Sequence, residues 1–201
     1  MDKIQYIEKP EWVSWDAIHE CLVLSHQVNA QDGLHMTNQD LKGEDLKKKL
    51  ANGHCFVALE GKRVVGVFGL IFFVGRRWWS WKKKVAYNCL DGILPDYQGT
   101  DVYFGLNDLR LKYIKDSDAD MIQSNTAENN WRIRKICRVK KFKTVQFSAT
   151  GKGADYYSVI MVKWLHGCPY SDRFVNMMFN LSKIIIKTIW KPGYKFRFWF
   201  Y

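Results

Sequence analysis

The sequence predicts a mixed α/β fold (α+β), with a mostly antiparallel central sheet and helices on both of its faces. A chain of 201 residues that is 47% apolar can bury a sizeable core. Helical and strand-like periodicities follow one another as two helices, three strands, a helix, a strand, a helix and two strands. Two of these strands are joined by a short Gly-containing connection, which is typical of an antiparallel hairpin.

Periodicity and turn residues define the elements of the first half of the chain. Ser14 is a good helix cap, and Ile18, Cys21 and Leu22 follow it at helical spacing. The polar, aperiodic residues 31–42 then indicate a loop. The segments expected here are a strand at 4–7, helices from 14 and over 43–50, and strands at 55–59 and 64–73 joined by Glu60-Gly61-Lys62-Arg63.

The second half is organised around a strand, a turn and a helix. Residues 85–94 read as a strand that Pro95 stops, and residues 102–115 carry an apolar helical face. A turn that opens a helix presents unpaired N–H groups and the positive end of the helix dipole, so it is a ready site for a pyrophosphate. The remaining segments are strands at 121–124, 142–150 and 156–164 and a basic helix at 128–140.

Composition excludes several classes of protein. The 31 Lys and Arg exceed the 20 Asp and Glu, and a net charge of +11 attracts nucleic acid, anionic lipid or a phosphorylated cofactor. The five cysteines are scattered singly, which indicates reduced thiols in a cytoplasmic protein without a metal centre. The longest uncharged apolar stretch, 64–75, is too short to span a bilayer as a helix, and residues 1–5 lack the apolar core of a secretory signal.

The central turn carries a motif. It reads Ile93-Leu94-Pro95-Asp96-Tyr97-Gln98-Gly99-Thr100-Asp101-Val102-Tyr103. This resembles the acetyl-CoA-binding motif of the GNAT N-acetyltransferases, in which a strand ending in hydrophobic-Pro-x-Tyr is followed by Gln/Arg-x-x-Gly-x-Gly/Ala and a helix. Asp101 and Tyr103 stand where the family usually has small residues. Downstream, Asn130 and the apolar residues between it and Phe142 resemble the family's Asn-led helix.

The resemblance implies an enzyme that moves an acetyl group directly from acetyl-CoA to a primary amine. It implies a GNAT domain over residues 1–168, followed by a basic, aromatic extension over 169–201. More loosely, residues 155–159 and 164–170 resemble GNAT proteins of bacterial surface-polysaccharide synthesis, which implies an amino sugar on a nucleotide or lipid carrier as acceptor. The residues expected to bind the cofactor are Ile93, Leu94, Gln98, Gly99, Thr100, Asp101, Val102, Tyr103 and Asn130.

Four residues are candidates for proton transfer in that reaction. Asp91 precedes Ile93 on the strand and is the first candidate for the general base; the alternative is a structural carboxylate that pairs with Lys82–Lys84 or lies at a strand end. His26 and His35 are expected in the loop region that overhangs the acceptor site in this fold, and either is a base, a sugar ligand or an ordinary polar residue. Cys137 falls where the family often has a tyrosine acid, and is a proton donor or a buried inert thiol.

Two basic segments leave alternatives open. In residues 76–84, basic and aromatic side chains alternate in short groups. This composition suits binding to single-stranded nucleic acid, lipid headgroups or a substrate diphosphate, and the alternative is a loop whose aromatic side chains pack inward. Residues 172–201 predict a basic amphipathic helix, which is either a peripheral anchor at the inner face of the membrane or a homodimer element. The rival to the enzyme is a degenerate GNAT-fold binding protein that uses its basic surface for membrane or nucleic acid. For the enzyme itself, nucleic acid is not an expected partner.

Overall fold

The computed structural model describes residues 3–31, 41–149 and 157–189, which form two compact units. Unit 1 comprises Met1–Phe72 and Ala86–Ala119, and unit 2 comprises Phe73–Val85 and Asp120–Tyr201. Both units combine helices with strands, and the strand pairs within them are antiparallel. The mixed α/β class predicted from the sequence is confirmed.

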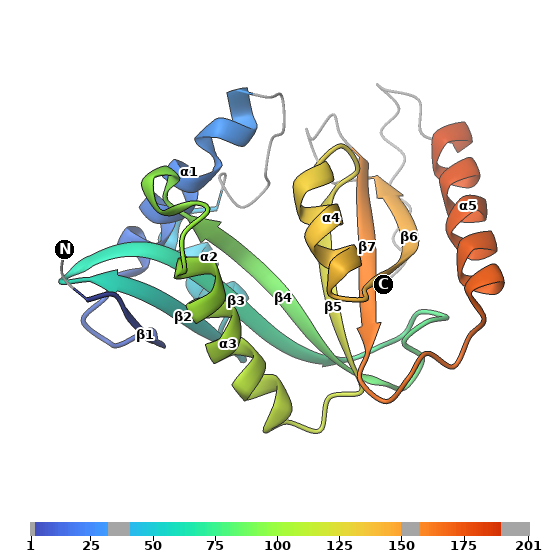
Figure 1. Ribbon diagram of the computed structural model, residues 1–201, viewed down its shortest axis with the longest axis horizontal. Helices are drawn as coiled ribbons and strands as arrows, with labels where there is room; N and C mark the ends of the chain where they lie inside the picture. The colour runs from blue at the N-terminus through green and yellow to red at the C-terminus, as the bar shows by residue number, and fades with distance from the viewer. Residues whose placement is uncertain (1–2, 32–40, 150–156, 190–201) are drawn as a thin grey trace. The chain divides into compact units, whose positions relative to one another are not determined.

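Unit 1 holds strands in the order β1-β2-β3-β4 (Figure 1). The hairpin is confirmed and is tighter than expected, because Glu60 pairs with Arg63 and leaves a two-residue turn in which Gly61 has φ 59°. The elements are β1 (Gln5–Glu8), α1 (Trp15–Gln31), α2 (Gly43–Lys49), β2 (Gly53–Glu60), β3 (Arg63–Val74), β4 (Lys84–Ile93), the 3₁₀ helix η2 (Pro95–Tyr97) and α3 (Val102–Lys115).

Helices α1 and α3 cover opposite faces of β4. The side chain of Asp91 accepts a hydrogen bond from Arg110 of α3. The next residue, Gly92, lies under α1, because an added Cβ there would be 2.4 Å from Oγ of Ser25. Since consecutive strand residues point to opposite faces, the predicted placement of helices on both faces is confirmed for unit 1.

Unit 2 holds strands in the order β5-β7-β6, with antiparallel pairing throughout. Alternate residues of β7 serve two cores: Val159 and Met161 pack with Cys137, whereas Ile160 and Val162 pack on the other face. The elements are β5 (Met121–Ala127), α4 (Trp131–Val139), β6 (Lys143–Ala149), β7 (Tyr157–Trp164) and α5 (Asp172–Ile189).

The basic aromatic segment 76–84 folds onto unit 2. The indole of Trp79 is 1% exposed and packs in the same core as Ile160 and Val162. The hydroxyl of Tyr170 donates to the carbonyl of Trp78 at 2.8 Å. The packed loop is therefore confirmed for these two tryptophans, while Trp81 is exposed.

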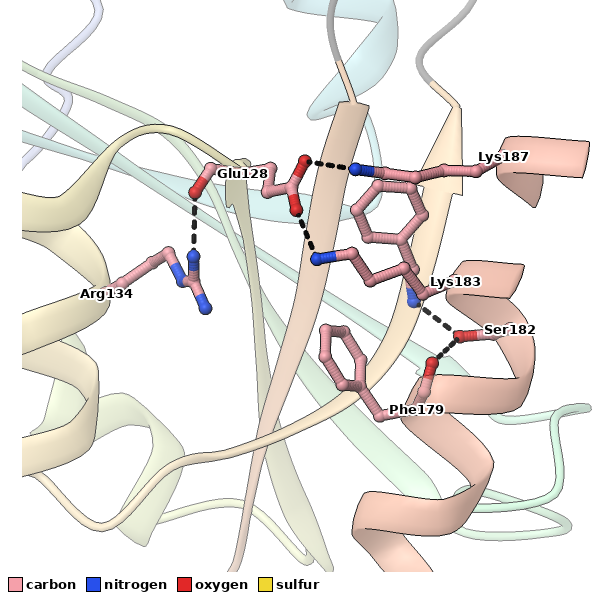
Figure 2. Close-up of polar contacts among 7 residues, drawn as sticks. Glu128, Arg134, Phe179, Ser182, Lys183 and Lys187 are labelled. Atoms are coloured by element: carbon pink, nitrogen blue, oxygen red, sulfur yellow. Dashed lines mark hydrogen bonds and ion pairs between the residues drawn. The ribbon is translucent and has the colours of Figure 1, made fainter. Parts of the chain in front are cut away.

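Helix α5 runs alongside the edge strand β6 (Figure 1). Ser182 accepts a hydrogen bond from the backbone N–H of Phe147 on β6 at 2.9 Å and donates to the carbonyl of Phe179 (Figure 2). A strand edge that would otherwise present unpaired groups thus gains a side-chain partner. Val175 of α5 is buried in the unit 2 core. The predicted helix is confirmed, and none of the helices in the described ranges is both long and apolar enough to cross a membrane.

Gly105 gives a test of how α3 packs on β1. An added Cβ at Gly105 would lie 2.3 Å from Cζ of Tyr6. Gly to Ala in an ordinary helix stabilises it by about 1 kcal/mol. Here we expect Gly105→Ala to destabilise the protein by about 1–3 kcal/mol in urea unfolding, because the ring must move. In a Tyr6→Ala background the same change should be neutral or stabilising, and a stabilising effect in the wild type would contradict the contact.

Candidate functional site

The end of β4 leads through a closely bonded turn into α3. The N–H of Leu94 donates to the carbonyl of Val65 on β3 at 3.0 Å, which holds the strand end in the sheet. Pro95 then starts the 3₁₀ turn, and the hydroxyl of Thr100 donates to the carbonyl of Tyr97 at 2.7 Å. Gly99 has φ +80°, a conformation that favours glycine, so the chain reverses direction there.

The side chain of Gln98 bonds this turn to the elements beside it. Its Nε2 donates to the carbonyl of Ile93 at 3.0 Å and to that of Ser25 in α1 at 3.3 Å. The motif position that the family resemblance singled out thus ties three elements of unit 1 together. The turn is fixed by side-chain bonds before any ligand binds, which is the preorganisation that an anion site requires.

The first turn of α3 presents backbone N–H groups at the end of β4. The first N–H groups of any α-helix have no partner within the helix, and they carry the positive end of the dipole. Asp101 occupies the cap position but makes no side-chain cap bond. Burial and the nearby Asp101 carboxylate both raise the pKa of the Tyr6 hydroxyl. The negative charge of Asp101 therefore lies close to this helix end.

Asp91 forms an ion pair with a buried arginine. Nη1 of Arg110 lies 2.6 Å from Oδ1 of Asp91, and the Arg110 side chain is only 3% exposed against 38% for Asp91. The guanidinium also lies over the ring of Phe68 at 4.4 Å. As a structural carboxylate, Asp91 was predicted to pair with Lys82–Lys84, whereas its partner in the structure is Arg110 of α3. The exposed side of the Asp91 carboxylate remains able to meet a proton.

His26 lies within helix α1 rather than in the predicted loop region. It lies against the backbone of Asp91, so the structure brings two of the predicted catalytic residues together. Burial lowers the pKa of His26 to about 4, and a hydrogen bond with the Asp91 backbone offsets only part of this effect. The imidazole is therefore neutral at pH 7, the form that accepts a proton. His35 lies outside the described residues.

Asn130 and Cys137 belong to unit 2. Asn130 caps α4, since its Oδ1 accepts a hydrogen bond from the N–H of Ile133 at 3.2 Å. Cys137 is 8% exposed and packs among Phe147, Val159 and Met161. Such apolar surroundings favour the inert thiol among the two interpretations of Cys137.

Arg110 is the site residue that sequence reasoning missed. It shares the buried stripe of α3 with Leu106 and Ile114, at a spacing of four residues on either side. A charged residue at the centre of an apolar stripe signals a buried partner, and a carboxylate on the neighbouring strand is the natural one. Arg110 stands in this pattern in the sequence, but the buried face of the helix at 102–115 was predicted from its apolar residues alone.

Several solved acetyltransferase structures are similar in fold to this chain. An acetyltransferase from Streptococcus agalactiae has a TM-score of 0.59 and 20% identity over 81% of this chain and 98% of that chain. A GNAT-family acetyltransferase from Staphylococcus aureus has a TM-score of 0.60 and 16% identity over 81% and 99%. One from Elizabethkingia anophelis, with acetyl-CoA bound, has a TM-score of 0.58 and 10% identity over 82% and 100%.

These likenesses show that the chain has the fold of GNAT acetyltransferases. No family model matches the sequence, and no curated protein matches it either. The fold predicted from the sequence resemblance is confirmed, and the roles of single residues stay predictions.

His26 should make stability depend on pH on the acid side. The unfolded chain binds a proton at His26 near pH 6.5, whereas the folded chain resists it down to about pH 4. The stabilisation from neutral His26 is therefore complete above pH 6.5 and is lost progressively as the pH falls to 4. Between about pH 7.5 and 4.5, we expect the wild type to lose roughly 2–3 kcal/mol more unfolding free energy than His26→Gln. Parallel losses in urea titrations of the two proteins would contradict a buried neutral His26.

Proposed function

We propose that this protein is an N-acetyltransferase that moves an acetyl group directly from acetyl-CoA to a primary amine. One observation carries the proposal: the Gln98-braced turn holds the start of α3 at the end of β4, within a fold shared with an acetyltransferase that binds acetyl-CoA. A helix start in this place suits the pyrophosphate of CoA.

The cofactor is bound mainly by main-chain groups of the turn. Main-chain amides in the turn at residues 98–103 hold the pyrophosphate. The amides of Gln98, Thr100 and Val102 already donate within the turn, so the other residues of the turn contribute most. Because the N–H of Leu94 is already bonded to Val65, the main chain at Ile93 is the part of β4 that is offered to the thioester. A backbone N–H held in the strand at this point stabilises the oxyanion that forms when the amine attacks the thioester.

Asp91 acts as the general base, directly or through a water molecule. The neutral amine attacks the thioester carbonyl, the C–S bond breaks, and the proton released by nitrogen passes to the carboxylate. Arg110 positions that carboxylate at 2.6 Å. Neutral His26 is the alternative base, and water rather than Cys137 protonates the departing thiolate.

The acceptor is a small amine, and we propose an amino sugar carried on a nucleotide or lipid. The net charge of +11 supports an acceptor that bears phosphate. We also propose peripheral contact with the inner face of a membrane through α5. Its outward side chains include Met177, Leu181 and Ile184, which are 54%, 47% and 64% exposed. These residues equally suit a homodimer.

Acetyl transfer is tested by following release of free CoA thiol from acetyl-CoA in the presence of a panel of amino sugars and amines. Mass spectrometry of the acceptor must show one added acetyl group. A protein that binds acetyl-CoA in calorimetry but acetylates no amine supports the degenerate binding protein. A protein that shows no affinity for millimolar acetyl-CoA refutes the cofactor site.

Replacing Asp101 should strengthen CoA binding. Its carboxylate is close to the proposed pyrophosphate site and makes no cap bond, so Asp101→Asn removes a repulsion without breaking a contact of the cap. We expect affinity for CoA to rise by about two- to fivefold at low salt, since unit charges several ångströms apart in a wet site interact by roughly 1 kcal/mol. High salt should reduce the gain. Asp96→Asn is the matched control, and equal effects of the two changes would refute a specific repulsion.

Replacing Asp91 separates its two roles. We expect Asp91→Asn to lower turnover by roughly 10²–10⁴-fold while CoA affinity stays close to that of the wild type. The substitution also strands the buried Arg110, so a drop of about 1–3 kcal/mol in stability should accompany it. The rate is therefore measured well below the melting temperature, with a pH profile of kcat/KM. An unchanged rate returns Asp91 to a structural role and leaves His26 as the base.

A further inference from the structure

We propose that a cavity between α4, β6 and α5 is a second binding site, for a phosphate ester with an apolar carbon group. The cavity has a volume of about 320 Å³ and lies wholly within unit 2. It shares no residue with the turn assigned to CoA. Its lining consists of Arg134, Arg138, Phe142, Lys143, Thr144, Met161, Asp172, Val175, Asn176 and Phe179.

The charge of the lining selects an anion. Arg134 and Arg138 stand one helical turn apart on the same face of α4, and Lys143 begins β6. Asp172 is the single carboxylate among the lining residues, so three cations face one anion and the net charge is +2. Two guanidinium groups at this spacing suit the oxygens of one phosphate, which arginine binds in a bidentate manner.

Two of the cations are held in place by the surrounding structure. Nη1 of Arg134 donates to the carbonyl of Glu128 at 2.8 Å, which uses one of the five N–H donors of the guanidinium (Figure 2). Lys143 is hydrogen-bonded to Asp172 of α5, and this bond raises the pKa of the Lys143 ammonium. Both groups are therefore held close to the cavity by bonds to the protein.

Helix α5 forms one wall of the cavity. Lys183 and Lys187 both reach Glu128, at 2.8 Å and 3.7 Å, and thus secure α5 to the end of β5 (Figure 2). These two lysines therefore contact the protein. Cations on the α4 side of the cavity, rather than these lysines, remain to meet an anion.

The apolar part of the lining determines the rest of the ligand. Phe142, Met161, Val175 and Phe179 contribute carbon surface beside the cations, and Thr144 and Asn176 add hydrogen-bonding groups. A bare inorganic anion would leave this carbon surface in water, whereas an ester places its carbon group there. A small soluble phosphate ester and a phospholipid headgroup share this chemistry.

The test uses the full-length protein with CoA present, so that the turn before α3 is occupied. One probe is phenyl phosphate, followed by calorimetry. The other is a vesicle of phosphatidylcholine with phosphatidic acid, followed by co-sedimentation. The variant is Arg138→Glu, because Arg138 is exposed and its loss leaves the core intact. The control is Arg132→Glu, an exposed arginine on the opposite side of α4 that changes the net charge equally.

We expect the wild type and Arg132→Glu to bind at least one probe alike, and Arg138→Glu to bind it about tenfold or more weakly. Binding of phenyl phosphate identifies a soluble ester, and binding of vesicles alone identifies a lipid headgroup. Equal weakening by both variants means attraction by net charge and overturns the site. Absence of binding to both probes, or binding that neither variant changes, overturns it as well. The readout does not depend on acetyl transfer, so the cavity and the proposed enzyme can fail separately.

Discussion

The ion pair between Arg110 and Asp91 is the constraint on which the candidate active site depends. A guanidinium that is only 3% exposed is strongly destabilised without a counter-ion. Helix α3 therefore cannot slide along β4 without separating the pair. The packing of α3 on β4 and the position of the Asp91 carboxylate follow from this contact, whereas the turn before α3 has its own bonds from Gln98 to Ile93 and Ser25.

This arrangement puts two demands on one carboxylate. As the counter-ion of Arg110, Asp91 neutralises a buried guanidinium. As the proposed general base, it must also accept a proton during each turnover. The neighbouring His26 is neutral because it is buried, so unit 1 holds a second proton acceptor close to the first. A buried histidine and a half-exposed carboxylate beside one strand end form a pair of titratable groups of the kind found in catalytic sites.

The elements could be predicted from the sequence because their signals are local. Pro95 stops β4, the apolar residues after Ser14 define α1, and Gly61 marks the hairpin; each acts within a few residues. The partners of charged groups could not be predicted in this way. Asp91 finds Arg110 on the next helix, and Glu128 finds Lys183 across unit 2, so both depend on how separate elements pack. The basic amphipathic pattern of residues 172–201 therefore left a membrane anchor and a dimer element open and did not predict that two lysines of α5 contact Glu128.

We propose that the turn before α3 is a preformed site for acetyl-CoA. Backbone amide NMR of the full-length protein during an acetyl-CoA titration tests this site most directly. We expect saturable shifts that are largest for the amides of residues 98–104 and for the end of β4. Saturable shifts that leave these amides unchanged, or no shift at millimolar acetyl-CoA, would contradict it.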